Sequence, residues 1–97
     1  MSPYDQFIEA CSYVHIVGVP KDIFAPLCKP DFYAKRIIRA AEKLDPGELK
    51  EQDATLMFNF AQFLIEKTLQ CEETAEKLLQ ILKNHNYSFK MRTALNA

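Results

Sequence analysis

Glycine and cysteine are scarce in this chain, and their scarcity excludes several kinds of site. The two glycines, Gly18 and Gly47, lie far apart and cannot form a loop that cradles phosphate. The three cysteines are odd in number and widely spaced, without a Cys-x-x-Cys pair, so no disulfide framework is implied. Cys11 and His15 could share a metal ion, but a structural zinc site needs four ligands and no second Cys/His pair exists. We therefore expect both side chains to be buried, with neither metal nor cofactor bound.

The chain also lacks an excess of charge of either sign and a long hydrophobic run. Its formal net charge is -1 and its pI is near 6.1, so the molecule as a whole does not attract nucleic acid or anionic membranes, although a local patch could. The N-terminus has no basic region of the secretory type, and its longest apolar run, YVHIVGV, is short and interrupted by His15. We expect a soluble, cytoplasmic protein that does not associate with membranes.

Residues suited to catalysis are present, but nothing in the sequence groups them. Cys28 or Cys71 could pair with His85, yet neither cysteine lies in an activating pattern. The acidic group at 72–76 is better explained by its place in the first turn of a helix, where it opposes the helix dipole. The sequence thus predicts a protein that is not an enzyme, and it indicates no small-molecule substrate.

What the chain does contain is the composition of one globular domain: 97 residues, 48% hydrophobic and 26% charged. We expect residues 1–89 to form it and 90–97 to be a C-terminal tail that can be mobile. Ser2 and Pro3 predict a helix over about 3–17 that Gly18 ends. Its expected buried side chains are Phe7, Ile8, Cys11, Val14 and His15. A short helical turn should follow at 20–24.

Three further helices are expected. Asp31 should cap a helix over 32–44 whose apolar residues repeat at helical spacing, namely Tyr33 or Ala34, then Ile37, Ala41 and Leu44. The stretch DPGEL, at 45–49, has the pattern of a capping box and predicts the next helix start. No proline or glycine occurs from 48 to 85, so this stretch is either one long helix or two. Its apolar stripe changes phase near 69–73, which favours two. The predicted fold is a compact all-α bundle of four to five helices, and Asn86 is a plausible cap for the last.

Residues 48–69 are expected to form the central apolar helix of this bundle. On a helical wheel, the apolar arc of LMFNFAQFLI (56–65) covers well over half the circumference, more than an ordinary surface helix shows. Two interpretations are open. The helix is either enclosed by its neighbours, or one flank faces the core and the other a second chain. In the second case the contact residues would be Met57, Phe58, Ile65 and Leu69.

A second candidate surface is basic. Lys35, Arg36, Arg39 and Lys43 lie within three turns of the helix at 32–44. They could form a solvated face, a site for an acidic protein, or a face that follows nucleic-acid phosphates. Our leading hypothesis is a small protein-interaction module (regulator, inhibitor, adaptor or chaperone-like) that binds a protein partner or itself through helical surfaces. Nucleic-acid binding through the basic face is the alternative.

Overall fold

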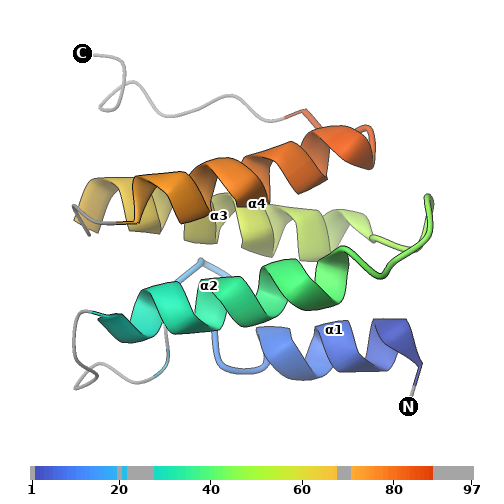
Figure 1. The fold of residues 1–97 in the computed structure, drawn as a ribbon, viewed down its shortest axis with the longest axis horizontal. Helices are drawn as coiled ribbons and strands as arrows, with labels where there is room; N and C mark the ends of the chain where they lie inside the picture. Colours follow the sequence, from blue (N-terminus) through green and yellow to red (C-terminus); the bar gives the residue numbers. More distant parts are fainter. Residues whose placement is uncertain (1, 20, 22–27, 68–70, 89–97) are drawn as a thin grey trace.

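A computed structural model of the chain contains four α-helices and no strand in the part that it describes (Figure 1). The described residues are 2–19, 21, 28–67 and 71–88, without the side chains of 28 and 29. The helices are α1 (Pro3–Cys11), α2 (Cys28–Ala41), α3 (Glu51–Lys67) and α4 (Glu72–Asn84). The expected all-α class is confirmed, and 48–85 contains two helices rather than one. The expected helical turn at 20–24 and the tail at 90–97 lie outside the described residues, apart from Lys21.

Three helices, α1, α2 and α4, lie side by side in that order, and α3 lies behind them, packed mainly on α4, in a compact molecule of 35 × 29 × 20 Å (Figure 1). α1 packs on α2 and α3 on α4, each pair in opposite directions. α2 packs on α4 in the same direction. The two parallel helices are joined at their starts, where the Thr74 hydroxyl donates a hydrogen bond to the carboxylate of Asp31.

α1 begins as expected but ends early. The Ser2 hydroxyl accepts a hydrogen bond from the Asp5 amide at 3.1 Å, and Pro3 takes the first helical position. The helix stops at Cys11 instead of running to residue 17. Beyond it, the chain reverses in a tight turn: the His15 amide donates to the Val19 carbonyl at 2.8 Å. The expectation that Ile8 and His15 are buried is therefore wrong, and both are exposed, whereas Phe7, Cys11 and Val14 are buried.

The expected helix start at 45–48 is a β-turn. The Glu48 amide donates to the Asp45 carbonyl at 3.0 Å, and Glu48 Oε1 accepts from the Asp45 amide at 2.7 Å. Pro46 and Gly47 hold the central positions, and Gly47 has φ +92°, which an α-helix does not allow. α3 consequently starts at Glu51.

α2 starts earlier than expected. It begins at Cys28, so Asp31 lies inside its first turn rather than before it. Pro30 is tolerated there because the first amides of a helix have no intrahelical acceptor. Of the expected apolar residues of this helix, Ile37, Ala41 and Leu44 are buried, and of the two alternatives for the first position Ala34 is buried and Tyr33 only partly so.

α3 is buried on almost every side, and non-helical residues provide much of its cover. The turn at 15–19 lies across it: a Cβ on Gly18 would come within 2.3 Å of the backbone carbon of Asn59. The Asn59 side-chain amide donates to the Ile16 carbonyl at 3.2 Å. The Tyr4 hydroxyl donates to the buried carboxylate of Asp53 at 2.9 Å. The turn after α1 thus occupies a face of α3 that a helix would otherwise have to cover.

α4 ends in a Schellman motif. Asn86 has φ +66°, and its amide donates to the Lys83 carbonyl at 3.0 Å. The next amide, of Tyr87, donates to the Leu82 carbonyl at 2.8 Å. The C-cap is His85, and Asn86, which was the expected cap, takes the left-handed position one residue further on. The turn brings the Tyr87 hydroxyl to the Leu49 carbonyl, to which it donates at 2.7 Å.

Candidate protein-interaction surface

The apolar flank predicted for partner contact is not a shared exposed surface. Met57 is fully buried, so the expectation that it meets a second chain is wrong for this conformation. Phe58 is 7% exposed and lines a groove with Leu79, Leu82 and Tyr87. Ile65 is half-buried against the core, and Leu69 lies outside the described residues. The sequence did not indicate that the turn at 15–19 packs on this helix, because the turn is not helical and has no periodic pattern.

The basic face of α2 is present, but its four cations have different surroundings. Lys35 forms an ion pair with Asp31, with 3.0 Å between Nζ and Oδ2. Arg36 is half-buried between α1 and α2, while Arg39 and Lys43 are exposed. Arg39 lies on the ridge of the helix, because it lines a hollow on the α1 side and another on the α4 side.

Three aromatic rings gather around Arg36. Tyr13 and Tyr33 stack in parallel, with ring centroids 5.6 Å apart, and Phe32 meets Tyr33 edge-on at 5.7 Å. The Arg36 guanidinium carbon lies 5.1 Å from the centre of the Tyr13 ring and 6.0 Å from that of Phe32. Phe32 is 56% exposed and Tyr13 39%. We call these four residues the aromatic–arginine cluster.

This cluster was not predicted from the sequence. The spacing of Phe32, Tyr33 and Arg36 on one helix would have indicated part of it, since residues three and four apart share a helix face. Tyr13 comes from a segment that was expected to be helical, and its stacking on Tyr33 depends on where α1 ends. No local pattern indicates that contact.

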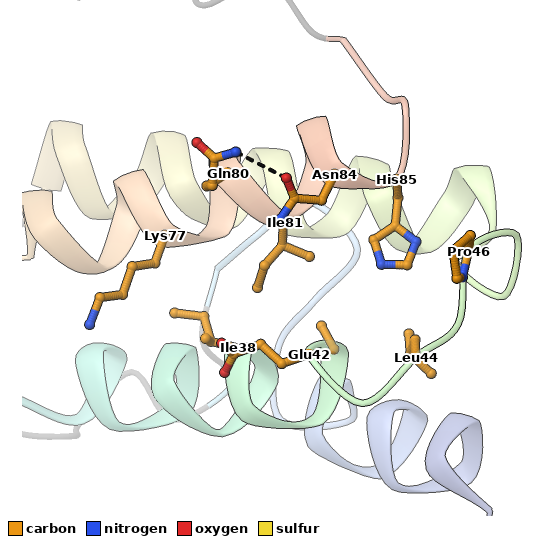
Figure 2. A pocket seen from close by; sticks show the side chains of 10 residues that line it. Ile38, Glu42, Leu44, Pro46, Lys77, Gln80, Ile81, Asn84 and His85 are labelled. Atoms are coloured by element: carbon orange, nitrogen blue, oxygen red, sulfur yellow. Dashed lines mark hydrogen bonds between the residues drawn. The ribbon is translucent and has the colours of Figure 1, made fainter.

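A groove runs between the two parallel helices (Figure 2). Its larger part has a volume of about 580 Å³ and is lined by residues of α2 and α4 and of the segments that follow each of them. Its apolar lining residues are Ile38, Ala41, Leu44, Pro46 and Ile81, and its polar ones are Glu42, Lys77, Gln80, Asn84 and His85. A smaller hollow of about 240 Å³ shares three of these residues and adds Lys35, Arg39 and Thr74. We call the two together the α2–α4 groove.

Asp31 fixes one end of this groove. Burial alone would raise the pKa of its carboxyl, but hydrogen bonds from Thr74 and Cys71 and the ion pair with Lys35 outweigh burial and lower it. The ionised carboxylate thereby ties the first turn of α2 to the first turn of α4.

The described residues show few features of a reactive site. Burial, followed by the nearby charge of Asp53, raises the pKa of the Cys11 thiol to about 12, so the thiol is protonated at neutral pH. No group of three or more His, Cys, Asp or Glu in the described part is arranged to hold a metal ion. None of the described helices has the length and apolar character needed to cross a bilayer. Comparison of the chain with protein-family models, curated proteins and solved structures finds no match.

Proposed function

We propose that this protein is a small, non-enzymatic interaction module that binds a protein partner through the exposed face of α2. The observation that supports this proposal is the aromatic–arginine cluster. Tyrosine, phenylalanine and arginine are enriched in protein–protein interfaces, and tyrosine and arginine are common among the residues that contribute most to binding energy. Phe32 leaves more than half of its surface in water, which a partner would remove.

The cluster is also ordered before any partner arrives. The Arg36 guanidinium lies over two rings, and Tyr13 is stacked on Tyr33. Side chains that are already held in place lose less conformational entropy when a partner binds. Large exposed aromatic side chains in a fixed arrangement therefore favour a binding surface over a solvated face.

The same cluster favours one other candidate, the binding of single-stranded nucleic acid. Proteins of that kind combine a cationic path for the backbone with aromatic rings on which bases stack, and Phe32 is exposed beside Arg36. The acidic residues nearby weaken this alternative. Asp31 pairs with Lys35, Glu42 lines the groove beside Arg39, and the chain has a net charge of -1. We therefore rank a protein partner first.

The proposal is tested by capture from a lysate of the cells that make the protein. Immobilised wild-type chain, Phe32→Ala and Ile8→Ala are compared, because Ile8 is an exposed apolar residue on α1 and is a matched control. We expect one or a few proteins to be retained by the wild type and by Ile8→Ala and lost with Phe32→Ala. If all three retain the same proteins, the cluster is not the binding surface.

A parallel capture uses lysate treated with nuclease. If nuclease treatment removes the retained material, the nucleic-acid alternative replaces the proposal. In that case Arg36→Gln together with Arg39→Gln should weaken binding to a single-stranded oligonucleotide, and the salt dependence should become less steep.

A further inference from the structure

We propose that the α2–α4 groove receives an acidic amphipathic segment of a partner protein. This inference rests on the proposed function and names the class of partner. An amphipathic helix laid in an apolar groove is a common mode of peptide recognition. In this protein, the charges along the groove indicate which charged residues the bound helix of the partner should carry.

The groove has one helix on each side, α2 and α4. α2 and α4 run in the same direction and are tied at their starts through Asp31 and Thr74. Further along, Ile38 of α2 and Ile81 of α4 face each other across the cavity of about 580 Å³ (Figure 2). This part of the groove can accept apolar side chains, because the neighbouring Ala41 and Leu44 are apolar as well.

The charges are unevenly distributed. Lys35, Arg39 and Lys77 line the smaller hollow, on the Thr74 side of the groove, and Glu42 is the one acidic residue among those described that line either hollow. No described residue forms an ion pair with Arg39 or Lys77. An incoming carboxylate would therefore meet Arg39 and Lys77, neither of which has an ion-pair partner among the described residues. Because complementary charges steer a partner and fix its orientation, acidic residues belong at this end.

The other end of the groove is neutral. Gln80 and Asn84 are hydrogen-bonded to each other at 3.0 Å, and the His85 ring lies beside Pro46 (Figure 2). His85 Nδ1 is buried and has no hydrogen-bond partner among the described residues. A polar group of the bound segment could pair with it. The fitting segment thus has carboxylates toward Lys77 and apolar side chains toward Ile81 and Leu44.

The test uses the full chain, labelled with ¹⁵N, and a fluorescein-labelled 16-residue helical peptide. The peptide has leucines at i, i+3, i+4 and i+7 and glutamates on its other faces, and a second peptide replaces each glutamate with lysine. We expect only the acidic peptide to bind and to shift the amide signals of Ile38, Lys77 and Ile81. Lys77→Glu should raise the dissociation constant about tenfold, as expected for a charge pair in an interface. Lys83→Glu makes the same charge change on α4, but Lys83 lines the separate groove that contains Phe58. The dissociation constant of this variant for the acidic peptide should therefore stay within about twofold of the wild-type value.

Several outcomes would overturn the inference. These are no binding of the acidic peptide, signal shifts that lie outside the groove, or equal losses from Lys77→Glu and Lys83→Glu. Sedimentation that shows a dimer of the free chain, dissociated by Lys77→Glu, would assign the groove to a second copy. If Phe32→Ala abolishes capture from lysate while Lys77→Glu does not affect the peptide, the proposed function stands and the groove assignment fails.

Discussion

At the scale of single residues, the side chains of this protein divide into those that close the core and those that a partner can reach. Two phenylalanines are examples of these two groups: Phe60 of α3 is fully buried, and Phe32 of α2 is largely exposed. Substitution of each by alanine removes the same atoms from two different environments. Comparison of the two variants therefore separates stability from binding.

We expect Phe60→Ala to lower the free energy of unfolding by about 3–5 kcal/mol, because it removes a buried ring and leaves a cavity. A domain of this size has a total stability of roughly 5–15 kcal/mol, so this one substitution should remove a large part of it. Phe32→Ala should change the same quantity by less than about 1 kcal/mol. Urea unfolding followed by circular dichroism measures both. Similar losses for the two variants would show that Phe32 is part of the core.

Asp31 should make stability depend on pH. Its pKa is lowered in the folded protein, so the ionised carboxylate stabilises the fold above the unfolded pKa, about 4. This stabilisation is lost as the pH falls through the lower folded value. Asp31→Asn should cost roughly 1–3 kcal/mol at pH 7, as expected for hydrogen bonds to a charged group, and should flatten the decline in acid.

The measurement is urea unfolding at a series of pH values from 7 to 2. Glu76→Gln is the control, since it removes one negative charge from an exposed position on α4, the helix that contains Thr74. If Asp31→Asn and the wild type lose stability in parallel as the pH falls, the carboxylate of Asp31 does not hold α2 to α4.

At the scale of elements, the turn after α1 is as important to the core as a helix. Gly18 and Gly47 both have positive φ, +87° and +92°, but only Gly18 is pressed against another backbone. A Cβ on Gly18 would lie 2.3 Å from the backbone of Asn59, while a Cβ on Gly47 would meet nothing within 4 Å. The two positions therefore have similar backbone strain and differ in packing.

Gly47→Ala should cost about 1–2 kcal/mol of unfolding free energy, the strain of a left-handed alanine. Gly18→Ala should cost clearly more, because the turn must also move away from α3. Chemical denaturation of the two variants gives the comparison, and ¹⁵N spectra should show changes around Asn59 for Gly18→Ala alone. Equal costs would mean that the turn is not in firm contact with α3.

These elements also show how far the sequence could predict the fold. The change of phase in the apolar stripe correctly predicted two helices within 48–85, because each helix buries one face. The end of α4 near Asn86 was also predicted from local chemistry, because asparagine tolerates the left-handed conformation that often ends a helix. The helix start at 45–48 was wrong because Pro-Gly suits a β-turn better than a first helical turn.

The parts that the sequence could not predict depend on contacts between distant segments. The basic residues of α2 were identified, but the ring of Tyr13 that stacks on Tyr33 comes from outside that helix. The burial of Met57 likewise depends on how the surrounding segments pack around α3, which no window of the sequence contains. Local patterns therefore predicted the elements better than the candidate site.

At the scale of the whole molecule, the rate at which the buried thiols react with a reagent measures global unfolding. Cys11 and Cys71 are buried, and the pKa of Cys11 is raised to about 12. In a Cys28→Ala variant, a disulfide reagent at pH 8 should therefore react slowly. Its rate should increase with urea in parallel with the global unfolding constant, because the reaction requires an exposed thiolate. Fast labelling that is independent of urea would show a local opening near one of the two cysteines.

The shared direction of α2 and α4 has a consequence for the order of folding. α3 and α4 follow each other in the chain and can pair as soon as the chain reverses, whereas α2 can meet α4 only after α3 has returned the chain to its starting side. Contacts between near neighbours in sequence cost less loop-closure entropy. We expect the α3–α4 hairpin to be formed in the transition state and α2 to dock afterwards. Higher φ-values for Leu64→Ala and Leu78→Ala than for Ile38→Val would support this order, and the reverse pattern would contradict it.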